Sequence, residues 1–284
     1  MSDEAEKLQR KTIDVEGVLA KKNPNLARFL PKIVINYLKH IVHQDEVNAM
    51  INKASNLYGL DFVDAILTQY EILVKPIGIE NIPPQGRVIV ASNHPLGGID
   101  GVGLMQAVGR VRKDILFPVN DILLYLENLK PLFIPINKLG SNVENIRLFN
   151  ESFASNNLIC YFPFGLVSRR KNGKIEDLEW KKTFITKARS NKRDIIPTHI
   201  SGRSSNFFYN LSEIRKKLGI RANIEMLYLS DEFHKQKGST MRITFGKLIP
   251  WQTFDNRFSD AQWAEKLRIH SYELANNCTA EFKL

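Results

Sequence analysis

From residue 74 onward, short apolar runs alternate with longer segments of helical periodicity. The runs are rich in Val, Ile, Leu and Phe, which favours strands over helices of the same length. This alternation is typical of α/β domains, in which a mostly parallel central sheet is flanked by helices. We predict strands at residues 74–79, 88–91, 115–119, 132–136, 158–162, 195–200, 224–229 and 241–245. We predict helices between and after them at residues 101–108, 122–129, 143–155, 178–190 and 260–276.

The first 73 residues have no such runs and are predicted to be helical. Apolar side chains recur at helical spacing in three segments, residues 26–42, 46–58 and 62–73. Gly59 is placed to end the second segment and Asp61 to cap the third. We therefore divide the chain into an N-terminal helical segment, 1–73, and a main domain, 74–284. The helical segment either packs on the main domain or lies on a membrane as an amphipathic platform, and the two roles are compatible.

The net charge of +10 is concentrated in one part of the chain. Residues 162–221 contain 15 Lys and Arg against 5 Asp and Glu, which accounts for the whole excess. Such a focused positive charge predicts an anionic partner, either a phospholipid surface, a phosphorylated carrier, cofactor phosphates or nucleic acid. We do not expect nucleic acid, because no recognised module is present and aromatic residues are not interleaved with the cations.

The cysteines and the N-terminus give the expected compartment. Cys160 and Cys278 provide neither a disulfide framework nor a metal-binding spacing, as is usual in a reducing compartment. Residues 1–22 are too polar for a secretory signal, and charges interrupt residues 26–42, the best candidate for a membrane span. We expect a cytoplasmic protein or a peripheral protein on the cytoplasmic face of a membrane.

Residues 90–101, VASNHPLGGIDG, place a histidine and an aspartate around two glycines at the end of a predicted strand. In open α/β sheets the reactive groups lie outside the carboxyl ends of the strands. The glycines Gly97 and Gly98 let the loop curl back, so that Asp100 can reach one ring nitrogen of His94. The other nitrogen would then face a substrate and take a proton from a hydroxyl or amine as it attacks a thioester. Taken alone, this stretch is weak evidence, because histidines at strand ends often bond only the backbone.

Residues 78–101, GIENIPPQGRVIVASNHPLGGIDG, resemble the first block of the glycerolipid acyltransferase superfamily, which includes bacterial lysophosphatidic acid acyltransferases. Residues 133–138, 162–169 and 195–197 are similar to its next three blocks, in the same order. The resemblance covers about residues 74–250 and implies that 74–284 is an acyltransferase domain. It implies that His94 is the general base and that Asp100 orients it. It also implies acyl carrier protein or coenzyme A thioesters as co-substrates, with no bound cofactor and no metal.

The candidate substrate contacts lie in these blocks and in the loop that follows the last of them. Ser168 and Arg169 combine a hydroxyl with a cation, which suits a phosphate or carboxylate of the donor or acceptor, or anionic headgroups. Backbone amides near Gly165 are candidates to stabilise an oxyanion. His40 and His43 lack nearby acid or thiol ligands, so we predict no metal site there. The full set of candidate contacts is Asn93, Gly97, Gly98, Phe162, Pro163, Gly165, Ser168, Arg169, Pro197 and Arg203.

Three departures from the superfamily pattern bear on the acceptor. Five residues, instead of the usual four, separate His94 from Asp100. The second block lacks its arginine, for which Lys138 or Arg147 is a candidate replacement. Phe164 stands where the superfamily has a glutamate that helps to bind a glycerol-phosphate acceptor. Its absence argues against that acceptor.

The variant pattern resembles the branch that acylates lyso-forms of bacterial amino-acid lipids, whose members are often labelled hemolysin-like. In that branch the products are ornithine and glycine lipids, and the second acyl chain is esterified to the 3-hydroxyl of an N-linked fatty acid. The resemblance implies a lyso-lipid acceptor, an acyl thioester donor and an anionic membrane surface as partners. Two alternatives stay open, a lysophosphatidic acid or lysophospholipid acyltransferase and a lipid-binding protein of the same fold without catalysis.

Overall fold

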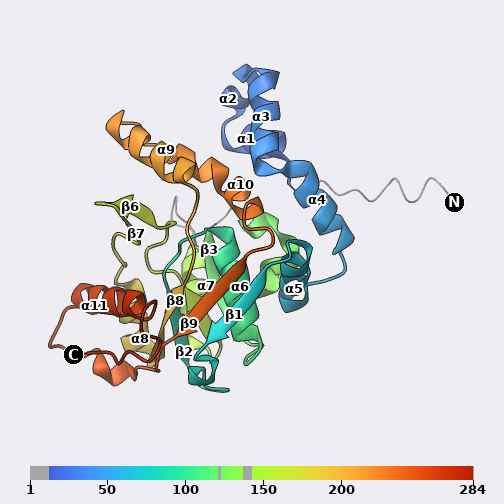
Figure 1. Cartoon of the computed structure of the whole chain (residues 1–284). Coiled ribbons are helices and arrows are strands. Elements are labelled where there is room, and N and C mark those ends of the chain that lie inside the picture. The colour runs from blue at the N-terminus through green and yellow to red at the C-terminus, as the bar shows by residue number, and fades with distance from the viewer. Residues whose placement is uncertain (1–12, 121–122, 137–142, 284) are drawn as a thin grey trace.

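The computed structural model describes residues 13–120, 123–136 and 143–283. Over these residues the centre is a seven-stranded sheet with the strand order β1-β9-β8-β2-β5-β3-β4 (Figure 1). Neighbouring strands are parallel except β8 and β9, which are antiparallel. The strands are β1 (Leu73–Ile77), β2 (Val88–Ser92), β3 (Ile115–Asn120), β4 (Phe133–Ile136), β5 (Leu158–Tyr161), β8 (Asp194–Ile200) and β9 (Thr240–Phe245). The predicted α/β class with a mostly parallel sheet is confirmed.

Helices flank the sheet and extend beyond one end of it (Figure 1). In that view α1–α3 and α9 project from the same end of the molecule, with α10 between them and the sheet. None of the helices in the described part of the chain is both long and apolar enough to cross a membrane. The helices are α1 (Val15–Lys22), α2 (Pro24–Phe29), α3 (Lys32–Val42), α4 (Gln44–Lys53), α5 (Gly59–Gln69), α6 (Gly98–Gly109), α7 (Val143–Ala154), α8 (Thr183–Asn191), α9 (Asn206–Lys217), α10 (Leu229–His234) and α11 (Asp260–Glu273).

The strand β2 lies in the middle of the sheet and has apolar neighbours on both faces. Val88 and Val90 belong to one buried cluster, whereas Ile89 and Ala91 belong to another. Successive side chains of a strand point to opposite faces, so a strand covered on both sides reads as an unbroken apolar run. This explains why β2 was recognisable in the sequence. Its rigid burial also fixes the turn that follows its carboxyl end.

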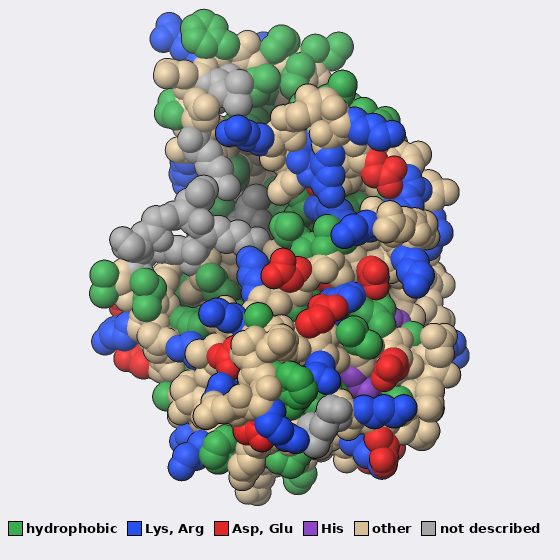
Figure 2. Space-filling view, turned by 90° about the vertical axis from the view of Figure 1, so that its left-hand side faces the viewer, with side chains coloured by type: hydrophobic (Ala, Val, Ile, Leu, Met, Phe, Trp, Pro, Cys, Tyr) green, Lys and Arg blue, Asp and Glu red, His purple; other side chains and the backbone are tan. Residues whose placement is uncertain are grey.

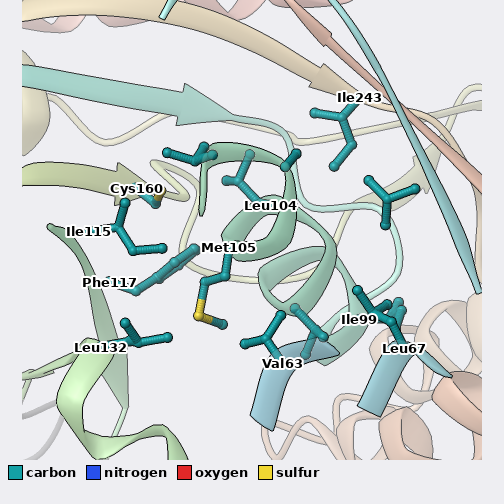
Figure 3. Close-up of a cluster of buried hydrophobic side chains, with 14 of the residues drawn as sticks. Val63, Leu67, Ile99, Leu104, Met105, Ile115, Phe117, Leu132, Cys160 and Ile243 are labelled. Carbon is teal, nitrogen blue, oxygen red and sulfur yellow. The ribbon is translucent and has the colours of Figure 1, made fainter. Parts of the chain in front are cut away.

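The N-terminal helices share the core of the main domain. Phe62, Val63 and Leu67 of α5 are buried in the same cluster as the side chains of α6 and of the sheet. Figure 3 shows Val63 and Leu67 close to α6 and its residue Ile99. The predicted boundary at residue 74 therefore lies within β1 and does not divide the core.

The start of α5 differs from the sequence prediction. Gly59 is the first residue of α5, with φ +57°, and does not end the preceding helix. Asp61 lies in the first turn of α5, and the N-cap position is Tyr58. A carboxylate in the first turn still interacts favourably with the helix dipole, so Asp61 stabilises the helix without capping it.

The strand predicted at residues 224–229 is wrong. This segment forms the 3₁₀ helix η5 (Ile224–Tyr228), which leads into α10. Its apolar residues do not share one face, because Glu225 is the fully buried residue and Leu227 is exposed. The structure also differs from the α-helix predicted at residues 122–129. Its described part forms the short 3₁₀ helices η3 (Leu123–Tyr125) and η4 (Glu127–Leu132), the second of which contains Pro131.

A small hairpin that the sequence analysis did not predict follows the third block. Its strands β6 (Arg169–Lys171) and β7 (Lys174–Glu176) pair antiparallel around Asn172 and Gly173. Both turn residues have positive φ, as a two-residue hairpin turn with right-handed strand twist requires. Asn-Gly is a strong hairpin signal, but the flanking strands are too short and too charged to show an apolar pattern.

The basic stretch at residues 162–221 is less exposed than its composition suggests. Arg169, Arg193 and Arg215 are all buried. The Arg193 guanidinium donates to backbone carbonyls that include those of Phe153 at 2.6 Å and Asn157 at 2.7 Å. These three cations hold the interior together and do not contribute to an exposed positive surface.

Candidate active site

The turn that contains His94 connects the end of β2 to the start of α6. Gly97 has φ +80° and ψ −135°, a conformation that residues with a side chain rarely adopt. A Cβ at this position would also lie 3.1 Å from the Leu229 side chain. The flexibility of Gly97 therefore lets the longer His–Asp spacing close into a tight turn. Gly98 is the first residue of α6 and has no positive φ.

Asp100 lies in the first turn of α6, fully buried, and its Oδ2 holds the turn together. This oxygen accepts hydrogen bonds from His94 Nδ1 at 2.9 Å, from the Leu96 amide at 2.7 Å and from the Gly97 amide at 3.0 Å. Burial raises the pKa of the Asp100 carboxyl, and the hydrogen bonds from His94 and from these amides oppose that rise. The N-terminal end of α6 also favours the ionised carboxylate.

The convergence of three donors on one oxygen decides the state of the imidazole. Backbone amides can only donate, so Asp100 Oδ2 acts as an acceptor toward Leu96 and Gly97. The proton shared with the ring then belongs to His94 Nδ1, which leaves Nε2 of the neutral ring with a lone pair. In the described part of the chain no side chain or backbone group hydrogen-bonds to Nε2. This is the state that a general base requires.

Phe162 fixes the plane of the His94 ring. The two rings are stacked with centroids 4.0 Å apart and planes 16° apart. The Phe162 ring in turn packs against that of Phe117 of β3, with ring centroids 5.0 Å apart. The His94 side chain keeps 17% of its surface exposed, whereas that of Asp100 has none. The imidazole is therefore held on one face, anchored at Nδ1 and accessible from outside.

The backbone of His94 forms hydrogen bonds with residues on both sides of the β6–β7 hairpin. Ser168 donates its amide to the His94 carbonyl at 2.7 Å, and the His94 amide donates to Asp177 Oδ1 at 3.3 Å. The Ser168 hydroxyl donates to the same Asp177 oxygen at 2.6 Å. The first and third blocks thus meet at His94. Sequence analysis missed Asp177, for which the sequence offers no signal beyond an acid just after the third block.

Several other candidate contacts build the fold around the turn. The side chain of Asn93 bonds both backbone groups of Ile200, at 2.7 and 2.9 Å, and ties the turn to β8. Pro197 lies inside β8, where it pairs with Ala91 of β2. The carbonyl of Pro163 accepts the Lys181 amide at 3.1 Å. None of these observed contacts tests a role in binding substrate.

Two candidates for anion binding are already engaged within the protein. The Arg169 guanidinium is buried and donates to Glu225 at 2.9 Å and to the Val167 carbonyl at 2.7 Å. The Gly165 amide donates to the Phe162 carbonyl at 3.0 Å, which closes a tight turn. The Arg169 guanidinium therefore shares the Glu225 carboxylate with Arg215, and its role in binding an anion stays a prediction. Arg203, in contrast, is exposed in the loop after β8 and bonds Asn206.

The second block falls partly outside the described residues, which exclude Asn137 and Lys138. Arg147, the other candidate replacement for its missing arginine, is exposed on α7 and pairs with Glu144 at 3.2 Å. Phe164, at the position of the glutamate, is buried in an apolar cluster with Trp180 and Phe184. The substitution therefore adds to the core and presents no charge.

His43 has neighbours that its sequence context did not reveal. His234 of α10 stacks on it with centroids 3.7 Å apart and planes 11° apart, and Glu46 lies 2.9 Å from its Nδ1. Asp231 lies 3.1 Å from its Nε2. The lone pairs of two stacked imidazoles lie in separate parallel planes, so one metal ion cannot face both rings in this arrangement. The cluster instead joins α4 to α10.

A comparison with protein families decides the identity of the fold. An acyltransferase family model matches residues 17–281 of the chain. The chain belongs to the acyltransferase family. The resemblance drawn from the four blocks is thereby confirmed, and the protein is an acyltransferase. The match begins within α1 and therefore includes most of the N-terminal helical segment.

Two curated relatives of this acyltransferase cover almost its whole length. One is the lyso-glycine lipid O-acyltransferase of Bacteroides thetaiotaomicron, 47% identical over 264 residues, or 92% of this chain and 97% of that protein. The other is the protein of the same name from Phocaeicola vulgatus, also 47% identical over 264 residues, or 92% and 95% of the two chains. The crystal structure of the 1-acyl-sn-glycerophosphate acyltransferase PlsC from Thermotoga maritima aligns over 88% of this chain and 99% of that one, with 15% identity and a TM-score of 0.46.

Proposed function

We propose that this acyltransferase moves a fatty acyl group from a thioester donor to the hydroxyl of a lyso-glycine lipid. The observation that carries the proposal is the 47% identity to two proteins of that name over 92% of this chain. The His94–Asp100 pair supplies the chemistry, because the two side chains are 2.9 Å apart with the free ring nitrogen accessible. The same pair would serve a lyso-ornithine lipid, so our choice of a glycine headgroup is supported by the names of the two relatives.

The reaction needs one proton transfer from the acceptor. His94 Nε2 takes the proton of the acceptor hydroxyl while its oxygen attacks the thioester carbonyl. The carbon–sulfur bond then breaks, an ester forms, and the proton passes from the imidazolium to the leaving thiolate. Asp100 stabilises the imidazolium between these steps, since its carboxylate is fixed at Nδ1. No covalent intermediate with the protein is required.

The acceptor assignment is supported by what stands at residue 164. A glycerol-phosphate headgroup is doubly charged and needs polar partners, whereas Phe164 is buried against Trp180 and Phe184. The acceptor we propose carries its hydroxyl at carbon 3 of an N-linked fatty acid, and its headgroup is a single carboxylate. Exposed Arg203, in the loop that contacts the His94 turn through Ser204 and Pro95, is our proposed contact for that carboxylate.

Acyl transfer to purified acceptors tests this proposal. The protein is incubated with labelled acyl carrier protein and coenzyme A thioesters in separate reactions, and products are identified by mass spectrometry. We expect a diacyl glycine lipid from the 3-hydroxylated lyso-lipid and none from the matched lipid that lacks the 3-hydroxyl. Lysophosphatidic acid should react at least about 100-fold more slowly, since a site without its polar partners rejects it. Equal or faster acylation of lysophosphatidic acid would refute the acceptor assignment.

We further propose that the protein acts as a peripheral protein on the cytoplasmic face of the membrane. Two exposed apolar stripes support this, one on α2 and α3 and one on α9. Phe29 and Ile33 are 80% and 77% exposed, and Leu218 at the end of α9 is 69% exposed. Tyr37 of α3 bonds Tyr228 of η5 at 2.8 Å, and Phe207 of α9 packs edge-on against the Tyr228 ring, which links the two stripes. Figure 2 shows apolar side chains and cations mixed at the end of the molecule that carries these helices.

Vesicle flotation tests this membrane contact. We expect wild-type protein to float with anionic phosphatidylglycerol vesicles more than with neutral ones, because exposed Lys216, Lys217 and Arg221 adjoin the stripe. The double variant Ile33→Asp/Leu218→Asp should bind about tenfold or more weakly, since each change removes apolar burial. Ile269→Asp on α11 is the matched control and should bind like the wild type. Equal binding by all three proteins, or no binding by any, would contradict the proposal.

A further inference from the structure

Both backbone groups of His94 are bound by a segment that begins 74 residues later in the chain. We infer that Asp177, which the family pattern does not include, is a positioning residue that holds His94 and stabilises its protonated form. The inference rests on the proposed role of His94 as general base. Its basis is a buried network that connects α11, the β6–β7 hairpin and the catalytic turn.

Both oxygens of the Asp177 carboxylate accept hydrogen bonds. Oδ1 accepts the Ser168 hydroxyl at 2.6 Å and the His94 amide at 3.3 Å, and Oδ2 accepts Trp180 Nε1 at 2.8 Å. The amide of His94 and the indole of Trp180 can only donate, so each carboxylate oxygen is an acceptor. Three donors favour the ionised form. They oppose the complete burial, which raises the pKa of this carboxyl.

The backbone of Asp177 is itself anchored to α11. Its amide donates to the Tyr272 hydroxyl at 2.7 Å, and its carbonyl accepts Arg268 at 3.1 Å. The carboxylate therefore cannot follow His94 if the turn shifts, and it acts as a fixed reference for that turn. Together with the Ser168 amide on the His94 carbonyl, it restrains the main chain of His94, while Asp100 and Phe162 restrain the ring.

The position of Asp177 also has an electrostatic consequence. Two buried carboxylates, Asp100 at the ring and Asp177 at the main-chain amide, lie beside one imidazole. When His94 accepts the substrate proton, both negative charges favour the imidazolium, and the low polarity around them strengthens the effect. Loss of one charge should therefore make the protonated intermediate less favourable. A purely structural role would not have this effect.

The same network changes the interpretation of Ser168. A serine that bound a substrate anion would affect the KM of that substrate when removed. The Ser168 hydroxyl is buried and donates to Asp177, so its loss should release the carboxylate and lower kcat without a change in KM. Ser168→Ala therefore separates a positioning role from a binding role.

The decisive experiment measures kcat, KM and the pH profile of kcat/KM for Asp177→Asn in the Trp180→Phe background. The second change removes an indole donor that would otherwise face the new amide, and Trp180→Phe alone is the reference. We expect kcat to fall about 10- to 100-fold with KM unchanged, as for a displaced catalytic group. The acid limb of the profile should move to lower pH, because the imidazolium loses a neighbouring charge.

Each outcome bears on the inference. A wild-type kcat, or a loss of kcat that is the same at every pH, would show that Asp177 is structural and overturn it. If the double variant does not fold, as judged by circular dichroism, Ser168→Ala takes its place, with an expected loss of about tenfold in kcat. A raised KM or an unchanged kcat for that variant would also overturn the inference. Loss of activity in His94→Ala is measured in parallel, so that failure of the positioning role is distinguished from failure of the general base.

Discussion

Replacing His94 by alanine is expected to reduce acyl transfer by about 10³-fold or more while leaving the fold intact. The expectation follows from the geometry of the ring, which is oriented by Asp100 at Nδ1 and by Phe162 on one face, with Nε2 accessible. Without the imidazole, the acceptor hydroxyl must attack the thioester with no group to take its proton. The measurement is the initial rate of diacyl glycine lipid formation at saturating donor and acceptor.

Two controls make the His94→Ala result interpretable. The melting temperature of the variant should stay close to that of the wild type, because the ring is partly exposed and its removal leaves the bonds of Asp100 to Leu96 and Gly97 in place. His40→Ala, an exposed histidine of α3, should retain the wild-type rate. If His94→Ala is folded and turns over at a near-normal rate, the general-base mechanism is excluded.

Replacing Asp100 by asparagine is expected to reduce kcat by about 10²- to 10⁴-fold, with little change in KM. The replacement side chain has one oxygen and one NH₂ group. The amides of Leu96 and Gly97 and His94 Nδ1 all meet the carboxylate at Oδ2, so the asparagine oxygen takes that place. The NH₂ group then takes the place of Oδ1, which has no partner among the described residues. The ring proton therefore stays on Nδ1, but the negative charge that stabilises the imidazolium is lost. The ring stays in place with the same tautomer, but its protonated form is less stable during the reaction.

This second prediction separates the effect of the Asp100 charge from that of its packing. Asparagine has nearly the same shape as aspartate, so the melting temperature of Asp100→Asn should change little while its kcat falls. Steady-state kinetics with the same lipid and donor provide kcat and KM. An asparagine variant with more than half of the wild-type kcat would mean that the charge of the Asp100 carboxylate does not stabilise the protonated form of His94.

The sequence predicted most of the sheet and the contact of His94 with Asp100 because both are local patterns. β2 reads as an apolar run since Ile89 and Val90 are buried on opposite faces. His94 and Asp100 are six residues apart, and the turn glycines between them indicate that the chain reverses. A short segment of sequence therefore contains all the information that places these two side chains together.

The features that sequence analysis missed depend on contacts between distant residues. Asp177 reaches the His94 amide across 83 residues, and Arg169 pairs with Glu225 across 56. The residue type alone could not show that Arg169 is buried in the interior. The same ion pair explains the false strand, because Glu225 takes the buried position that a strand of this segment would give to an apolar side chain.

The tautomer of His94 is the most direct test of the account. Nitrogen-15 NMR of histidine-labelled protein reports which ring nitrogen carries the proton, and the His94→Ala spectrum identifies the signals of His94. At a pH at which the ring is neutral, we expect a protonated Nδ1 and an unprotonated Nε2 in the wild type. We expect the same in Asp100→Asn, because an oxygen faces Nδ1 in both proteins. A wild-type His94 with its proton on Nε2 would contradict the account, since that nitrogen could not accept the proton of the lipid hydroxyl.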